Sequence, residues 1–248
     1  MMQGAAARAA TISQLALLVL SCAPVGNSVP DTSATVAGAT TLTADQKAAG
    51  WRSLFDGTGN SAWRGYKSQA FPAGWRIVDG ILTKTDSVPD IITKDQFGNF
   101  ELALDWMESP GGNAGIFYRG TEEYDHIYWS APEYQLLDDA RDSAAKADRR
   151  FAAGANYALY PSPAGIIKGA GEWNSAMIAV QGNRVQHWAN GQKLLEYDLG
   201  SPEWEAKVKA SKFKVYPNYG RAKRGHIGIQ GDHRGTLSLR NVRIRELP

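Results

Sequence analysis

The chain has little cysteine and little histidine: one cysteine, Cys22, and four histidines among 248 residues. Because Cys22 lies close to the N-terminus, the remainder of the chain has no partner for a disulfide, and its stability must come from a packed core. The chain also lacks an early apolar run long enough to cross a bilayer. The run "LALLVLSC", Leu15 to Cys22, is too short for that.

Neither sign of charge dominates, since 27 basic and 25 acidic residues leave a net charge of +2. No basic run exceeds a few residues, so the sequence gives no indication of a nucleic-acid partner or of an anionic membrane surface. Glycine-rich phosphate loops, serine nucleophile elbows and zinc-type clusters are missing as well. A retaining glycosidase needs two carboxylates about 5 Å apart, and no same-strand pair supplies them. The acids of "ELALDWMES" stand at the wrong intervals.

The N-terminus has the pattern of a targeting segment. Arg8 precedes the apolar run, whose length is typical of a secretory signal. Two interpretations stay open: an ordinary signal cleaved near Ala23, or a lipoprotein signal in which Cys22 becomes the lipidated first residue and anchors the chain to a membrane. We therefore predict a signal peptide over residues 1–22 and an exported protein, a periplasmic or outer-membrane lipoprotein of a bacterium. Residues 23–42 are small, polar and aperiodic, which indicates a flexible tether before one domain over residues 43–248.

What the chain does contain is a series of short strand patterns. Asp79-Gly80 and Asn190-Gly191 each stand between alternating apolar residues, which predicts two hairpins. Further strands are predicted over residues 74–85, 99–109, 115–120, 156–161 and 175–180. The last strand pattern changes phase at Asn241, which indicates a bulge.

Two short helices are predicted, one capped by Thr43 and one with Ser201 at its N-cap and Pro202 in its first turn. Many short strands with one or two short helices indicate an all-β sandwich of two antiparallel sheets.

Two strand patterns carry polar residues that a core does not need. In "PEYQLLDD", Tyr134 and Leu136 share one face while Glu133 and Gln135 share the other. In "GHIGIQGDHRG", the isoleucines share one face, and the other carries a second polar set: His226, Gln230, and just beyond them Asp232 and His233. Solvation alone would explain a polar outer face. The convergence of Glu, Gln and His beside glycines favours a ligand site in a groove.

Two further residues are candidates with an open interpretation. His187 shares a strand face with Val185, so it is either a structural histidine or a substrate contact. Arg119 alternates with Phe117 and either forms a surface ion pair or grips a substrate. A Glu/His pair is also compatible with a divalent cation, although the spacing does not demand one.

Segments across the chain, among them "GWRSLFDGTGNSAWRGY", "SPGGNAGIFYRG", "PEYQLLDD" and "GHIGIQGDHRGTLSLRNVRIREL", resemble the 3-keto-disaccharide hydrolase family. This family is also described as 3-keto-glucoside 1,2-lyase/2-hydroxy-glucal hydratase. The resemblance runs from about Trp51 to Leu247. It implies a concanavalin A-like jelly-roll sandwich and an exported enzyme that cleaves 3-keto glycosides.

The resemblance also implies a chemistry. Oxidation at C3 of a sugar acidifies the C2 proton, so one base can remove it and expel the C1 substituent without a carboxylate pair. The family's "E-x-Q" strand matches Glu133 and Gln135, and its "GLQ-D-H" ending matches Gln230 and His233. We predict His233 or Glu133 as the base. Predicted substrate contacts are Gln135, Gln230, Arg119, His226, His187 and Asp232. An extra glycine in "GIQGDHRG" leaves open which of Asp232 and His233 points into the groove.

A second class of function stays open. Jelly-roll sandwiches also serve as carbohydrate-binding or cell-surface modules, and a fold does not fix a function. Such a module would need exposed aromatic rings and no Glu133 or His233. A glycosidase acting on unoxidised sugars is disfavoured by the missing carboxylate pair.

Overall fold

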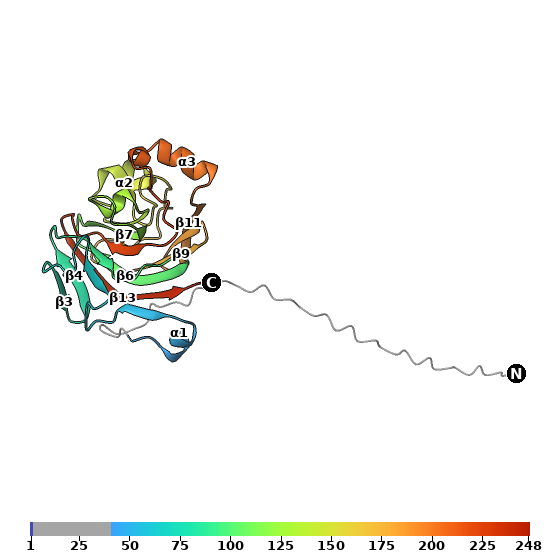
Figure 1. Cartoon of the computed structure of the whole chain (residues 1–248). Coiled ribbons are helices and arrows are strands. Elements are labelled where there is room, and N and C mark those ends of the chain that lie inside the picture. The colour runs from blue at the N-terminus through green and yellow to red at the C-terminus, as the bar shows by residue number, and fades with distance from the viewer. Residues whose placement is uncertain (2–40) are drawn as a thin grey trace.

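Two antiparallel β-sheets packed face to face form the body of the molecule in a computed structural model that describes Met1 and residues 41–248 (Figure 1). The predicted signal peptide, Cys22 and nearly all of the predicted tether lie outside the described residues. The prediction of an all-β sandwich of two antiparallel sheets is confirmed. Thr43 begins the first regular element of the described part.

The larger sheet has eight strands in the order β11-β10-β9-β6-β13-β4-β3, and β1 also pairs with β13. Its strands are β1 (Arg52–Phe55), β3 (Trp75–Val78), β4 (Ile81–Thr85), β6 (Phe100–Glu108), β9 (Asn174–Gln181), β10 (Arg184–Ala189), β11 (Gln192–Asp198) and β13 (Thr236–Glu246). The smaller sheet has five strands in the order β2-β5-β12-β7-β8. Its strands are β2 (Trp63–Gly65), β5 (Ile91–Thr93), β7 (Asn113–Gly120), β8 (Glu133–Leu137) and β12 (His226–Ile229).

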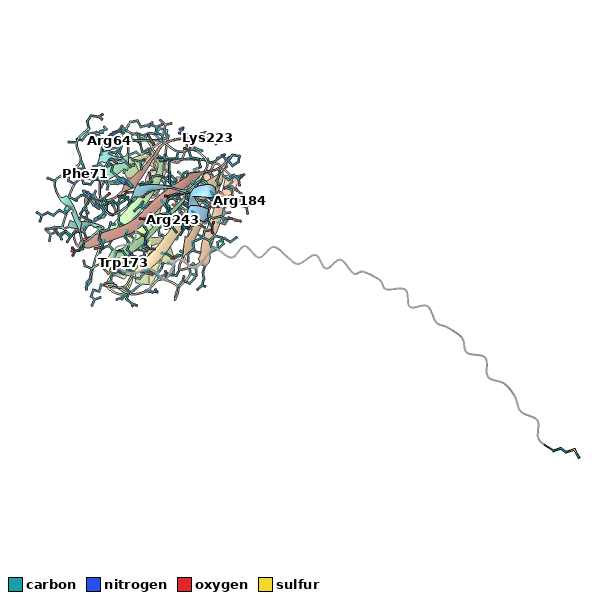
Figure 2. The ribbon with its side chains drawn as sticks, turned by 90° about the horizontal axis from the view of Figure 1, so that it is seen from below. Arg64, Phe71, Trp173, Arg184, Lys223 and Arg243 are labelled. Carbon is teal, nitrogen blue, oxygen red and sulfur yellow. The ribbon has the colours of Figure 1, made fainter. Side chains whose placement is uncertain are left out.

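The helical segments are short and lie outside the two sheets. They are α1 (Ala44–Ala48), α2 (Ser143–Ala147) and α3 (Pro202–Lys209), with the 3₁₀ turns η1 (Ile127–Trp129), η2 (Arg149–Phe151) and η3 (Lys212–Val215). In Figure 1, α2 and α3 lie beyond β7, on the outer side of the smaller sheet, and α1 lies on the opposite side of the sandwich. Figure 2 looks from below onto the outer face of the larger sheet. No helix in residues 41–248 is long and apolar enough to cross a membrane.

Both predicted hairpins form, and their turns have the required backbone. Asp79 and Gly80 have φ angles of 49° and 75°, and Asn190 and Gly191 have φ angles of 50° and 78°. Two consecutive positive φ angles are the signature of the type I′ turn, which Asp-Gly and Asn-Gly favour. The predicted bulge is confirmed too, because the pairing of β13 with β6 shifts register around Asn241.

The two predicted helices are confirmed through their caps. Thr43 and Gln46 form a capping box at α1, and the Ser201 hydroxyl accepts from the Trp204 amide at 3.1 Å at α3. The predicted strand over residues 156–161 is wrong. Asn156 makes only isolated bridges, and Ala158 has a φ of 63°, so the chain turns back instead of extending.

The core fills the space between the sheets with the apolar face of each strand. Tyr134, Leu136, Ile227 and Ile229 are fully buried, as the alternation predicts. Burial of one such side chain is worth roughly 1.5–3 kcal/mol. The same alternation directs Glu133 and Gln135 to the outer side of the smaller sheet, where the loops and short helices cover them.

Candidate active site

A cavity of about 180 Å³ lies on the outer side of the smaller sheet. Five of the predicted site residues line it, together with four residues that the sequence reasoning missed. The predicted ones are Glu133, Gln135, Gln230, Asp232 and His233; the others are Asn113, Tyr128, Tyr157 and Lys212. The structure therefore brings the polar residues of "PEYQLLDD" and "GHIGIQGDHRG" together in one cavity.

Glu133 has room for its carboxyl in this cavity because its diagonal neighbour on β7 is a glycine. Gly115 on β7 pairs with Gln135 on β8, and a Cβ at position 115 would lie 2.3 Å from Glu133 Oε1. The Gly115 carbonyl also accepts from the Gln230 amide at 2.9 Å, which joins β12 to the same point. Gly115 thus provides the space that the Glu133 carboxyl occupies.

Burial governs the chemistry of Glu133. The residue is 5% exposed. Desolvation raises the pKa of Glu133 to about 8, while the nearby ammonium group of Lys212 opposes that rise. The Gln135 side-chain nitrogen faces the Ala114 carbonyl, which can only accept a hydrogen bond. The same nitrogen donates to Glu133 Oε1 at 2.7 Å. At neutral pH the folded protein therefore holds a carboxyl group that is largely protonated and oriented by a donor.

Lys212 and two tyrosines form the other wall. Lys212, at the start of η3, places its ammonium 4.5 Å from the centre of the Tyr157 ring. Although part of the side chain stays exposed, desolvation lowers the pKa of Lys212, and the Glu133 carboxylate acts in the opposite direction. Burial also raises the pKa of Tyr128 to about 12, so its hydroxyl stays protonated and can donate.

The loop that carries Asp232 and His233 is tied down through its backbone. Lys84 Nζ donates to the His233 carbonyl at 2.5 Å, and the Ser87 hydroxyl donates to the Asp232 carbonyl at 2.8 Å. The Gly231 amide donates to Asp90 at 2.7 Å. These anchors leave the side chains free to face the cavity. His233 Nε2 lies 3.9 Å from Asp232 Oδ1.

Gln230 has a buried acceptor atom for which residues 41–248 supply no hydrogen-bond donor. It is 4% exposed, and its Oε1 has no hydrogen-bond partner there. A buried acceptor without a donor costs free energy, which a ligand hydroxyl would recover. This supports a polar ligand such as a sugar in the cavity.

The other three predicted contacts, His187, Arg119 and His226, do not line this cavity. His187 is fully buried between the sheets, where it bonds to the Tyr118 hydroxyl at 2.9 Å and the Gly154 carbonyl at 3.0 Å. Burial lowers the pKa of His187 to about 4, so it is a neutral structural histidine.

Arg119 has a φ of 52°, which breaks the strand alternation, and its guanidinium donates to the carbonyls of Gly98 and Gly182. His226 has both ring nitrogens occupied, by the Thr93 carbonyl at 2.7 Å and the Gln96 side chain at 3.1 Å. Neither lines the cavity.

In the described part of the chain, no group of three or more His, Cys, Asp or Glu side chains could hold a metal ion. The predicted divalent cation stays a prediction without assigned ligands. A larger cavity exists on the other side of the sandwich. The smaller cavity holds the buried Glu133, and titratable groups with a perturbed pKa cluster at catalytic sites, so the smaller cavity is the candidate active site.

Comparison with known proteins agrees with the resemblance seen in the sequence. A family described as the 3-keto-alpha-glucoside-1,2-lyase-like domain matches residues 50–245. A relative from Bacteroides thetaiotaomicron named 3-keto-disaccharide hydrolase is 34% identical over 229 residues, covering 80% of this chain and 79% of the relative.

Solved structures agree as well. A protein from Parabacteroides distasonis, provisionally named a glycosyl hydrolase, is 31% identical with a TM-score of 0.78, and the match covers 84% of this chain and 99% of that one. A Bacillus subtilis protein with a galectin-like fold is 14% identical with a TM-score of 0.50, over 84% of this chain and 94% of the other. The second likeness shows the fold alone.

Proposed function

Since the chain belongs to the 3-keto-alpha-glucoside-1,2-lyase-like family, and is thus a carbohydrate-active enzyme, we propose that it cleaves 3-keto glycosides by eliminating the C1 substituent. The observation that carries the proposal is the shared cavity of Glu133 and His233, in which burial raises the pKa of the Glu133 carboxyl to about 8. A protonated carboxyl and an imidazole in one cavity are suited to acid and base roles.

The proposed reaction needs one base and one acid. The base takes the C2 proton, and the electron pair of that C–H bond moves to form an enolate with its charge on the C3 oxygen. The enolate then re-forms the ketone as a C1–C2 double bond forms and the C1–O bond breaks. The departing oxygen takes a proton from the acid. Addition of water across the double bond gives the free 3-keto sugar, so the sum is hydrolysis.

Glu133 is the proton donor in this proposal, because its raised pKa keeps it protonated at neutral pH. His233, at the exposed rim beside Asp232, is the base. Lys212 stabilises the enolate oxygen, since a cation beside developing negative charge lowers the barrier. Gln230 Oε1 accepts a hydroxyl hydrogen of the sugar.

Two substrates that differ only in the leaving group test these roles. With a methyl 3-keto-glucoside, Glu133→Gln should reduce the rate by about 10²–10⁴-fold, because methoxide needs a proton to leave. With the 4-nitrophenyl analogue it should stay within about tenfold of wild type, since nitrophenolate leaves without one. His233→Gln should lose both activities, and with them the exchange of the C2 proton for deuterium in D₂O.

Loss of C2 exchange in Glu133→Gln, together with loss of both activities, would make Glu133 the base and contradict this assignment. Binding of 3-keto sugars by the wild type without exchange or cleavage would instead favour the binding module.

We also propose that the protein is exported and lipidated at Cys22, on the pattern of its first 22 residues. In a bacterial host grown with an alkyne-tagged fatty acid, the wild type should carry the tag and Cys22→Ser should not. Equal labelling of both, or of neither, would contradict lipidation at this residue.

A further inference from the structure

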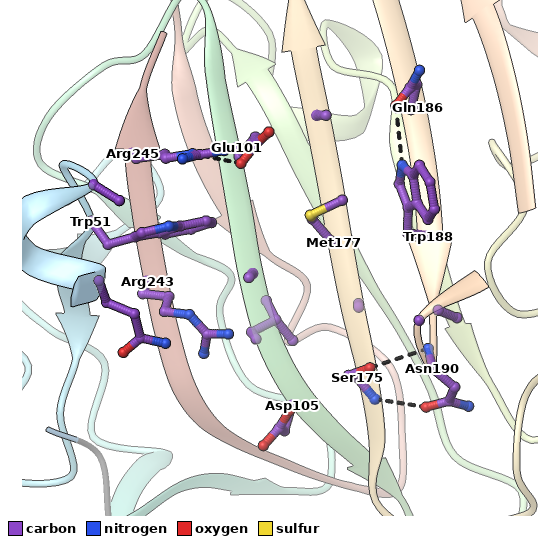
Figure 3. A pocket seen from close by; sticks show the side chains of 18 of the residues that line it. Trp51, Glu101, Asp105, Ser175, Met177, Gln186, Trp188, Asn190, Arg243 and Arg245 are labelled. Atoms are coloured by element: carbon purple, nitrogen blue, oxygen red, sulfur yellow. Dashed lines mark hydrogen bonds and ion pairs between the residues drawn. The ribbon is translucent and has the colours of Figure 1, made fainter. Parts of the chain in front are cut away.

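The larger cavity, of about 520 Å³, is a trough across the outer face of the larger sheet (Figure 3). Its floor consists of small or flexible side chains in register: Ala103 on β6 lies opposite Met177 on β9, and Ala179 lies one step along. Bulkier side chains rise on both sides, from β10 and from β13 with α1. The trough is on the opposite side of the sandwich from the candidate active site, which lies outside the smaller sheet.

Trp188 on β10 forms one side of the trough and lies flat. Its indole N–H donates to the Gln186 side chain at 3.1 Å, which fixes the ring. In Figure 3 the Trp188 ring is seen face-on, whereas Trp51 is seen edge-on. Trp188 is half-buried and lines the trough, and no aromatic ring or side-chain cation of residues 41–248 stacks on it. Part of the indole is therefore accessible from the trough.

The other tryptophans of this face are covered. Trp51 stands between two guanidinium groups, with Arg243 at 5.5 Å and Arg245 at 5.2 Å from its ring centre. Trp173, which lies toward the rim in Figure 2, has the Arg240 guanidinium 4.1 Å above its ring. Trp188 alone among these three offers a free stacking surface in the described chain.

The polar groups around the trough are nearly balanced in charge. Glu101 pairs with Arg245 at 2.6 Å, and Asp105 pairs with Arg240 at 3.2 Å. Arg243 forms no ion pair within the described residues, where its one hydrogen bond is donated to the Asn241 carbonyl at 3.2 Å. Its remaining N–H groups can therefore donate to a ligand. Because Glu101 and Asp105 are already paired, the trough is suited to hydroxyl groups more than to a polyion.

We propose that this trough is a second carbohydrate site, which binds a neutral oligosaccharide. The apolar face of one sugar ring stacks on Trp188, and hydroxyls of the sugar accept hydrogen bonds from Arg243. A flat amphipathic ring beside donors and acceptors is the chemistry that sugars require, and the volume lies in the range of ligand pockets. The site is independent of the proposed reaction, because it lies on the other face of the sandwich.

Indole resonances in ¹H–¹⁵N spectra of the protein test this site directly. We would titrate maltotriose, cellotriose and laminaritriose, and assign the Trp188 indole from the spectrum of Trp188→Phe. At least one trisaccharide should shift the Trp188 resonance. Trp188→Ala should weaken that binding about tenfold or more, as expected for a lost stacking contact. Trp173→Ala, a tryptophan outside the trough, is the matched control and should bind as the wild type does.

Arg243→Gln is a second variant, which should also weaken binding if Trp188→Ala does not fold. The proposal is overturned if none of the three sugars shifts the Trp188 resonance, or if binding survives in both variants. It is also overturned if the only effect of Trp188→Ala is loss of self-association, since the face would then be an interface between two copies. Glu133→Gln should leave this binding unchanged, which separates the result from the proposed activity.

Discussion

Replacing Glu133 by glutamine should make the protein more stable at neutral pH while it lowers activity on substrates with a poor leaving group. Burial raises the pKa of Glu133 to about 8, from an ordinary value of 4.5. Between these values the folded chain keeps a proton that the unfolded chain releases. Stability from this group is therefore complete below pH 4.5 and is lost as the pH rises toward 8.

The size of the effect follows from the same pKa. At pH 7 the difference from the ordinary carboxyl value is about 2.5 pH units, and at ~1.4 kcal/mol per unit the folded state is destabilised by roughly 3 kcal/mol. Glutamine does not titrate and can keep a hydrogen bond to Gln135. Glu133→Gln should therefore gain up to about 3 kcal/mol relative to wild type between pH 4.5 and pH 7.

Urea unfolding of both proteins at the two pH values measures this difference. The matched control is Glu246→Gln, which removes an exposed carboxylate paired with Arg224 at 3.4 Å. It should change the free energy of unfolding by less than ~1 kcal/mol at either pH. If Glu133→Gln has the same stability difference from wild type at both pH values, the argument from burial is refuted.

Three further outcomes follow from the same cavity. In Gly115→Ala the new Cβ would lie 2.3 Å from Glu133 Oε1 and displace the proton donor. This variant should lower kcat by about 10-fold or more and lose the fall of kcat at alkaline pH. An unchanged pH profile would contradict the packing argument. Wild-type kcat should fall as the pH rises through about 8. Lys212→Met should move this fall to higher pH, because it removes the cation that opposes the raised pKa of Glu133. A fall at the same or a lower pH would count against the interaction of Lys212 with Glu133. Lys84→Met should free the loop of His233 and lower kcat more than the affinity for substrate, whereas equal kcat with the wild type would show that the anchor is unnecessary.

Most of the fold could be predicted from the alternation of apolar residues in strands and from the residue types at turns. The Asp79-Gly80 and Asn190-Gly191 turns could be predicted because their positive φ angles depend on the local residue types. The segment after Asn156 could not, because its apolar residues serve an irregular loop that packs on β8. Its backbone reverses at Ala158, a residue that gives no turn signal.

The candidate site was predictable where it lies on strands. Glu133 and Gln135 follow the alternation of β8, and so their common face was readable from the sequence. Lys212 and Tyr157 come from loops far apart in the chain, and nothing local indicates that they meet over Glu133.

The predicted contacts that lie away from the cavity do so for local reasons. Arg119 was misplaced by the strand rule because its left-handed backbone turns the side chain away. For His187 the pattern could not distinguish a polar partner inside the core from a ligand outside it, and the Tyr118 hydroxyl turned out to be the partner.

The most direct test of the proposed function is release of glucose from 3-keto-trehalose, compared with trehalose under the same conditions and with a chelator in a parallel reaction. We expect glucose from the keto sugar and none from trehalose, since only the C3 ketone acidifies the C2 proton. A loss of release with chelator would add a metal ion to the mechanism. Equal release from both sugars, or release from neither, would contradict elimination from a 3-keto glycoside.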